Sequence, residues 1–179
     1  PVPGWLKNHP IIKILYCDKD YGPATKFIPA FLEEKENPST KIIVVDDDRV
    51  YGKSLIEFFC HWSDILPDCA VCAGGIMFPT SEMPSYAYDK YKASEPTLSS
   101  YLVCVDILLG TDGFLVKPKF FDDSLICYES APKSAFFEDV FWISGNLAKR
   151  KIKRYFIPSD KNVFLRGAFK YKLVCNASI

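Results

Sequence analysis

The sequence has no excess of charge of either sign, because 22 lysines and arginines stand against 22 aspartates and glutamates in 179 residues. Proteins that bind nucleic acid through the charge of the whole chain normally have a basic excess, so this class is disfavoured. No stretch approaches the roughly 20 apolar residues that a membrane-spanning helix needs. Disorder is excluded because it requires low hydrophobicity, whereas 49% of these residues are hydrophobic.

Histidine is scarce, with only His9 and His61 in the chain. A zinc site built on Cys69-x-x-Cys72 would need a second pair of ligands, so this spacing favours a buried strand over a zinc or redox centre. The seven cysteines are an odd number and lie mostly within apolar runs. This usage is typical of reduced thiols in an intracellular protein and predicts a cytoplasmic location, the host cytoplasm if the protein is viral.

The basic residues are concentrated near the end of the chain. From Lys149 onward nine residues are basic and only Asp160 is acidic, so this stretch carries +8 and the rest of the chain −8. It is either a solvated tail or a basic flap that helps to hold a polyanionic ligand such as a diphosphate. The irregular segment from Pro79 to Ser100 is expected to be a loop that shapes the acceptor side of a site.

Short apolar runs alternate with helical patterns along the chain. We expect strands at 11–16, 41–45, 70–73, 101–106, 113–116 and 155–157, and helices at 24–35, 54–63, 120–127 and 136–149. Pro29 should interrupt or shorten the first helix. The β-branched run within 41–45 is typical of a strand buried on both faces in a parallel sheet. The alternation predicts the α/β class, with a mostly parallel central sheet flanked by helices.

Three aspartates, Asp46, Asp47 and Asp48, follow this run directly. Ligands of open α/β sheets bind at the carboxyl ends of the strands. Carboxylates so close repel one another unless a cation neutralises them, and a hard divalent cation is the natural partner. Alternate residues would project toward one cavity, so Asp46 and Asp48 are predicted to face a metal ion or a ribose. The alternative is that one or two of the three only cap the next helix.

Two other segments carry groups suited to a ligand. The segment 18–26 runs through a Gly-Pro turn into a helix, and offers backbone N–H groups and the charge of Lys26 to a phosphate; a capped turn is the alternative. The segment 136–142 sets Glu138 and Asp139 among large aromatic residues. A partly desolvated carboxylate is a useful general base, although an amphipathic helix with exposed acids in its first turn is equally compatible.

Taken together, these segments resemble a GT-A-type glycosyltransferase, most closely the small, family-2-like group that includes the chlorella-virus capsid glycosyltransferase domain. The resemblance covers roughly residues 3 to 158. The residues that carry it are Pro3-Gly-Trp-Leu6, Asp20-Tyr-Gly-Pro-Ala-Thr-Lys26, Val45-Asp-Asp-Asp48 with Tyr51, Gly110-Thr-Asp-Gly-Phe114 with Pro118 and Phe121-Asp122, and Glu138-Asp-Val-Phe-Trp-Ile-Ser-Gly145. Each motif alone is weak, but their order and spacing together are specific.

The resemblance implies a UDP-hexose donor, a glycan or glycoprotein acceptor, and Mn2+ or Mg2+ as cofactor, as in viral capsid glycosylation. It implies Asp46 and Asp48 as metal ligands, Glu138 and Trp142 on the acceptor side, and Asp139 as the base of an inverting reaction. In a retaining reaction Asp139 would only position the acceptor. The implied donor-binding residues are Asp20, Lys26, Asp46, Asp47, Asp112 and Gly113.

We expect residues 1–179 to form a single GT-A-like domain with a Rossmann-like nucleotide-sugar half. Members of this group begin with a further strand and helix that contact the nucleobase, and these are expected upstream of Pro1. No signal peptide is visible in the opening Pro-Val-Pro-Gly-Trp. Two other functions stay open: metal-dependent phosphoryl or nucleotidyl transfer, for which paired acids also suffice, and a non-catalytic module that binds nucleotide sugars or carbohydrate.

Overall fold

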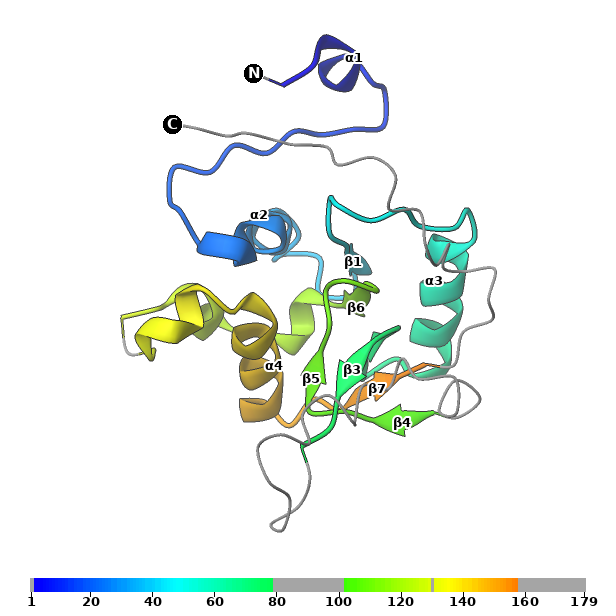
Figure 1. Ribbon diagram of the computed structural model, residues 1–179, viewed down its shortest axis with the longest axis vertical. Helices are drawn as coiled ribbons and strands as arrows, with labels where there is room; N and C mark the ends of the chain where they lie inside the picture. The colour runs from blue at the N-terminus through cyan, green and yellow to red at the C-terminus, as the bar shows by residue number, and fades with distance from the viewer. Residues whose placement is uncertain (1, 79–101, 130, 158–179) are drawn as a thin grey trace.

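A five-stranded sheet forms the centre of the molecule in the computed structural model, which describes residues 2–78, 102–129 and 131–157 (Figure 1). The strands lie in the order β1-β6-β2-β7-β4. They are β1 (Ile42–Val44), β6 (Phe114–Val116), β2 (Ala70–Cys72), β7 (Arg154–Phe156) and β4 (Val103–Cys104). A separate two-stranded sheet pairs β3 (Gly75–Ile76) with β5 (Ile107–Leu108).

The α/β class is confirmed, but the expectation of a mostly parallel sheet is wrong. Only β2 and β7 pair in parallel, whereas β1 with β6, β2 with β6 and β4 with β7 are antiparallel. Strand β6 lies between β1 and β2 and runs opposite to both. A continuous apolar run reports that a strand is covered on both faces, and it carries no information on the direction of the neighbouring strand.

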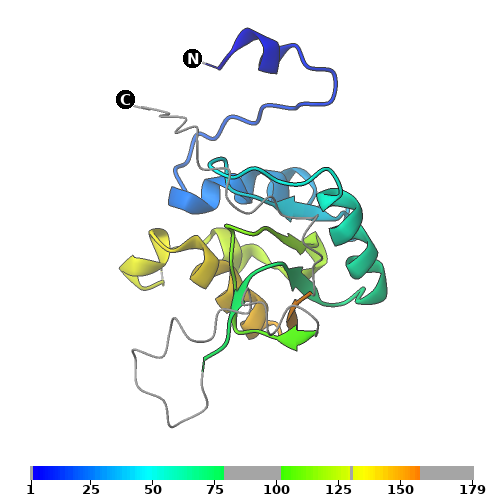
Figure 2. The ribbon, with the colours of Figure 1, turned by 45° about the vertical axis from the view of Figure 1, so that its right-hand side comes forward.

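Helices cover both faces of the sheet (Figures 1 and 2). On one face, α3 (Leu55–Ile65) packs Leu55 and Phe59 against Val71 of β2 and Leu115 of β6. On the other face lie α2 (Ile28–Glu33) and α4 (Asp139–Lys149), whose buried residues join the alternate strand residues in a larger cluster. Burial on both faces was predicted for the run 41–45 and is only partly found there, since Ile42 and Val44 of β1 are buried but Ile43 is half-buried. In β2 and β6 all residues are buried.

Several predicted elements are shorter than expected. The predicted helix 24–35 is split into a 3-10 helix, η1 (Gly22–Lys26), and α2, with Pro29 in the first turn of α2. In place of a helix at 120–127 there are two 3-10 helices, η3 (Pro118–Phe120) and η4 (Asp123–Ile126). The predicted helix 136–149 begins at Asp139, after a further 3-10 turn, η5 (Lys133–Phe136).

The predicted strand at 11–16 is wrong. These residues follow a short helix, α1 (Gly4–Lys7), and pair with no strand, and Ile11 and Tyr16 are 86% and 77% exposed. The predicted acceptor-side loop at 79–100 and most of the basic tail lie outside the described residues. Among the helices that are described, none is long and apolar enough to cross a membrane.

Candidate functional site

The ends of three strands converge at one edge of the sheet. Phe114, the first residue of β6, pairs with Val44 at the end of β1 and with Cys72 at the end of β2. Residues that follow β1 and β2 and residues that precede β6 therefore meet there. This places the segment after Val44, which contains the three aspartates, beside the Gly110–Gly113 turn.

Lys26 joins two of the predicted site carboxylates at this edge. Its Nζ lies 2.6 Å from Oδ1 of Asp46 and 3.0 Å from Oδ2 of Asp139. The three side chains come from η1, from the residues after β1 and from the first turn of α4. They are 27%, 20% and 10% exposed, respectively. A cation is thus held between two carboxylates that are largely removed from water, where charges interact more strongly than at the surface.

The pKa of Lys26 reflects this position. Burial by itself would lower it, but hydrogen bonds to Asp46 and Asp139 and the charges of both carboxylates outweigh the burial, so the pKa lies above its usual value. Oδ2 of Asp139 is itself buried and lies 3.0 Å from the Lys26 ammonium. The Asp139 carboxylate is therefore shielded from water and paired with Lys26.

Tyr51 and Gly110 shape the surroundings of Asp46, and neither was assigned a role from the sequence. The Asp46 N–H donates to the Tyr51 hydroxyl at 2.9 Å, and this hydroxyl donates to the Thr111 carbonyl at 3.2 Å. A Cβ at Gly110 would lie 3.1 Å from Lys26 Nζ and 3.2 Å from Asp46 Oδ1. Both residues belong to the motifs that carry the resemblance, which is the signal that could have found them.

Asp112 and Gly113 also lie at this edge. Asp112 contacts Gly74, at the end of β2, so closely that a Cβ on Gly74 would overlap its carboxylate. Gly113 is buried, has a φ of 85° and lies beside Phe59 and the Val44 carbonyl. Asp112 therefore lies beside the end of β2, and Gly113 is part of the turn that leads into β6.

Asp47 and Asp48 form an exposed turn after Asp46. The Asp48 side chain is 73% exposed and lies 3.9 Å from the Nε of Arg49. Within the described ranges, no three His, Cys, Asp or Glu side chains are grouped so that they could hold a metal ion. Asp46 and Asp48 nevertheless supply hard oxygen donors on one short segment, and Mg2+ is commonly held by one or two carboxylates with phosphate oxygens and water completing the shell. The residues present fit a metal ion of this kind.

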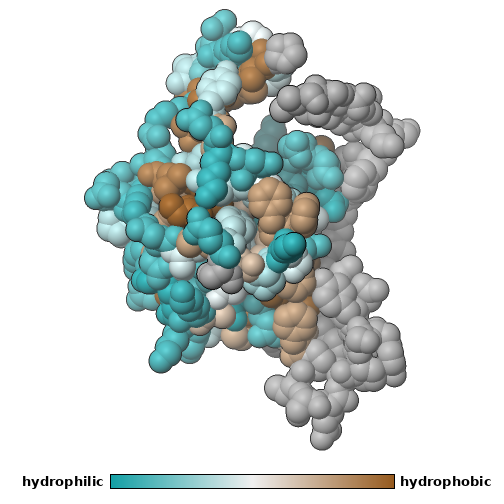
Figure 3. All heavy atoms as spheres, turned by 90° about the vertical axis from the view of Figure 1, so that its left-hand side faces the viewer, coloured by the Kyte–Doolittle hydropathy of each residue, from teal (hydrophilic) through white to brown (hydrophobic). Residues whose placement is uncertain are grey.

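The remaining predicted residues lie around the cluster. Asp20 is exposed and accepts a hydrogen bond from the Gly22 N–H at 2.7 Å, which is the capped turn weighed as its alternative. Glu138 precedes α4 and lines a pocket of about 630 Å3 with Phe141 and Trp142. Glu138 directly precedes Asp139 in the chain, whereas neither Asp139 nor Lys26 lines this pocket. The side of the molecule that carries α2 and α4 is hydrophilic over most of its area, with hydrophobic patches between (Figure 3).

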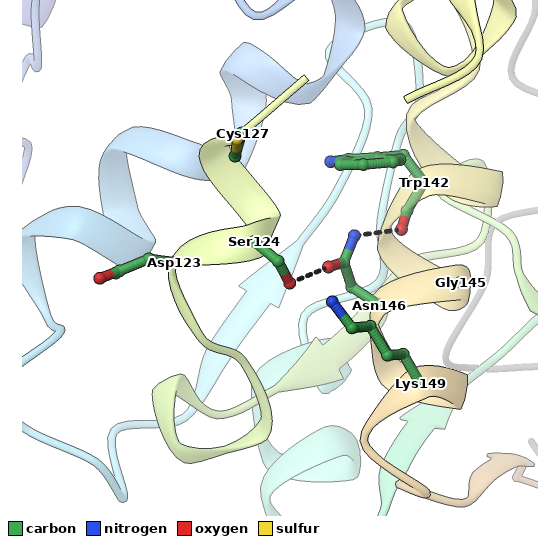
Figure 4. Close-up of a pocket in the computed structure, with 7 residues that line it drawn as sticks. All are labelled: Asp123, Ser124, Cys127, Trp142, Gly145, Asn146 and Lys149. Carbon is green, nitrogen blue, oxygen red and sulfur yellow. Dashed lines mark hydrogen bonds between the residues drawn. The ribbon is translucent and has the colours of Figure 1, made fainter. Parts of the chain in front are cut away.

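Trp142 also lines a second pocket, of about 440 Å3, between η4 and α4 (Figure 4). Its indole N–H donates to the Leu125 carbonyl at 2.8 Å, and its ring stacks on Tyr128 with the centroids 4.8 Å apart. In this pocket Asn146 links the two helices, since it accepts from the Ser124 hydroxyl and donates to the Trp142 carbonyl. One side of the Trp142 ring is therefore fixed by packing, which makes it a rigid wall for either pocket.

Tyr128 places a second buried polar atom near Asp139. Its hydroxyl is buried without a hydrogen-bond partner in the described part of the chain. Burial, together with the charge of Asp139, raises the pKa of Tyr128 to about 12, so the phenol stays neutral. The surroundings of Asp139 are thus aromatic and poor in water on this side.

No model of a known protein family matches the chain, and no curated protein matches it significantly. The likeness to GT-A-type glycosyltransferases accordingly rests on the motifs described above and on nothing further.

Proposed function

We propose that the protein is a metal-dependent glycosyltransferase that moves a hexose from a UDP-sugar to a hydroxyl group of a glycan or glycoprotein. The observation that carries the proposal is the contact of Lys26 with both Asp46 and Asp139. These residues come from three separate motifs, and their contact brings to one edge of the sheet the residues that we propose to bind phosphate, to bind the metal ion and to accept a proton. Free thiols at all six described cysteines support a cytoplasmic location.

The residues divide the chemistry between them. Asp46 and Asp48 would hold Mn2+ or Mg2+, which when bound neutralises the charge that develops on the departing diphosphate. Lys26 adds a positive charge beside the phosphates, and Asp112 lines the sugar. In an inverting reaction the acceptor oxygen attacks C1 of the sugar, the bond from C1 to the phosphate oxygen breaks, and Asp139 takes the hydroxyl proton. The low exposure of Asp139 keeps water from competing for this position.

The pocket lined by Glu138 suits the acceptor. Its wall contains the aromatic rings of Phe141 and Trp142 and the carboxylate of Glu138. Aromatic faces pack against the apolar face of a sugar ring, while a carboxylate accepts hydrogen bonds from its hydroxyl groups. We assign this pocket to the acceptor because its wall combines aromatic rings with a carboxylate, and because Glu138 directly precedes Asp139 in the chain.

Donor binding tests the proposal first. Calorimetric titration of UDP and UDP-glucose should show binding in the presence of Mn2+ that disappears with EDTA. Asp46→Asn should weaken this binding by about tenfold or more, because a carboxylate that faces the cation is lost. Asp64→Asn is the matched control, since Asp64 makes the same 2.6 Å contact with Lys41, which lies at the opposite end of β1 from Asp46. Binding that is indifferent to EDTA would contradict the metal assignment.

Turnover tests the role of Asp139. Asp139→Asn should bind donor with nearly unchanged affinity and lose transfer by about 10²-fold or more, as expected when a general base is removed. Product analysis by mass spectrometry checks the reaction class, because a glycoside reports glycosyl transfer and a phosphoester reports phosphoryl or nucleotidyl transfer. Donor binding without turnover in the wild-type protein would identify a binding module instead.

A further inference from the structure

Lys26 occupies the space between the carboxylates that a metal ion would use. Its Nζ is within 3.0 Å of an oxygen of both Asp46 and Asp139. Hard divalent cations bind carboxylate oxygens at about 2.0–2.6 Å. A metal ion on Asp46 Oδ1 would thus lie within about 5 Å of the Lys26 ammonium, which is 2.6 Å from the same oxygen, and two cations at such a separation repel each other.

The surroundings leave Lys26 little freedom to share this space. The site of a Cβ on Gly110 is only 3.1 Å from Nζ, so the Gly110–Gly113 turn closes one side of the ammonium. The Lys26 side chain is 27% exposed. The Lys26 side chain would therefore leave the site toward solvent. The metal ion and the ammonium of Lys26 are alternatives, because both would bind the same carboxylate.

We propose that Lys26 is a resident cation that neutralises part of the charge of Asp46 and Asp139 in the empty site and must leave Asp46 before a divalent metal binds there, so that Lys26 sets the metal affinity of the protein. The inference rests on the proposed use of a metal ion. Lys26 stabilises the buried Asp139 carboxylate while the site is empty, since an unpaired buried charge is costly. Once displaced, its ammonium is available to the phosphates of the donor. Because coupling between two binding events is reciprocal, the metal weakens the ion pairs of Lys26 as much as Lys26 weakens metal binding.

Titration with Mn2+ alone measures this competition. Lys26→Gln removes the charge and retains a polar side chain, and it should bind Mn2+ about tenfold more tightly than the wild-type protein because two carboxylates lose their counter-ion. Lys35→Gln is the matched control, since Lys35 makes an equally short 2.6 Å ion pair with Asp123 and touches neither Asp46 nor Asp139. Its Mn2+ affinity should equal that of the wild-type protein.

A second measurement uses the wild-type protein and does not depend on the folding of a variant. The amine of Lys26 should react faster with a lysine-acylating reagent when Mn2+ is present, because the displaced side chain is more exposed. The reactivity of Lys35 should not change with Mn2+ and serves as the internal reference. Mass spectrometry of the digested protein assigns the modification to each lysine.

The outcomes separate this inference from the proposed function. Tighter Mn2+ binding by Lys26→Gln, or faster acylation of Lys26 with Mn2+, supports the competition. Equal or weaker Mn2+ binding by the variant, with Lys26 equally reactive in both conditions, overturns it, while metal-dependent UDP binding by the wild-type protein would leave the proposed function standing. If neither protein binds Mn2+, with or without UDP, both the inference and the metal-dependent function are wrong.

Discussion

A single phenol hydroxyl holds the backbone at Asp46. Tyr51 accepts a hydrogen bond from the Asp46 N–H and donates one to the Thr111 carbonyl. Burial raises the pKa of Tyr51 above its usual value, so the hydroxyl remains a donor at neutral pH. Tyr51 thereby joins the residue after β1 to the turn before β6, the two backbone segments that bring Asp46 and Gly110 to Lys26. Tyr51 is a positioning residue for the site.

Removal of this hydroxyl should affect both stability and binding. Tyr51→Phe should lower the free energy of unfolding by about 1 kcal/mol, because the Asp46 N–H and the Thr111 carbonyl each lose a partner. It should also weaken UDP binding with Mn2+ several-fold, since Asp46 is no longer held. Denaturant unfolding and calorimetry measure the two effects.

Tyr128→Phe is the control for this prediction. The Tyr128 hydroxyl is buried without a partner among the described residues, so its removal should leave the unfolding free energy unchanged or raise it slightly. An equal loss of stability in the two variants would show that the hydrogen bonds of Tyr51 do not matter. Donor affinity unchanged in Tyr51→Phe would refute its positioning role.

At the scale of elements, β6 determines where the site residues meet. Because it is antiparallel to both neighbours, its start lies at the carboxyl ends of β1 and β2. Gly113 makes this entry tight, since its φ of 85° is costly for residues with a Cβ. A parallel strand at this place would have brought its own carboxyl end to this edge, and the Gly110–Gly113 turn would lie at the opposite edge.

The predictions from the sequence succeeded where a signal was local. The apolar run of 70–73 and the pattern of 54–63 correspond closely to β2 and α3. The apolar run of 11–16 failed because a run of this kind becomes a strand only when a partner strand pairs with it, and composition does not report a partner. The direction of β6 depends in the same way on contacts between segments far apart in the chain.

Local signals in the sequence likewise predicted only part of the candidate site. The local pattern predicts that the aspartates following residue 45 lie at the end of a strand. In the structure, Asp46 lies just beyond the end of β1. The contact of Lys26 with Asp46 and Asp139 follows from no spacing in the sequence, since it depends on how η1 and α4 pack beside the sheet. Only the resemblance, which is carried by several motifs at once, grouped these residues before the structure did.

At the scale of the whole molecule, polar contacts at the surface tie the layer of 3-10 helices to α4. Asp122 precedes η4, accepts hydrogen bonds from the N–H and the hydroxyl of Ser124, and makes a 2.8 Å ion pair with Arg150 at the end of α4. The same hydroxyl lies 2.9 Å from Oδ1 of Asn146, which is buried in α4, so its single proton is shared between two acceptors. These contacts hold together two elements that both contribute to the larger hydrophobic cluster.

The contacts of Asp122 with Ser124 and Arg150 make the free energy of unfolding depend on pH in the acidic range. The hydrogen bonds of Ser124 and the charge of Arg150 lower the pKa of Asp122 from 3.8 to about 2. A carboxyl group whose pKa is lower in the folded protein binds fewer protons there than in the unfolded chain, so its contribution to stability is complete above about pH 4 and is lost as the pH falls toward 2. Because the Asp122 side chain is 44% exposed, solvent screening reduces this contribution to about 1 kcal/mol.

Comparison with variants isolates the effect of Asp122 from that of the other acids. The unfolding free energy of Asp122→Asn should be about 1 kcal/mol below that of the wild-type protein at pH 6, and the difference should shrink between pH 4 and pH 2. Ser124→Ala should reproduce most of this behaviour, since the Ser124 hydroxyl is the largest cause of the lowered pKa. Urea unfolding at a series of pH values measures all three proteins. A difference that stays constant down to pH 2 would mean that Asp122 acts only as a cap, through contacts that its charge does not influence.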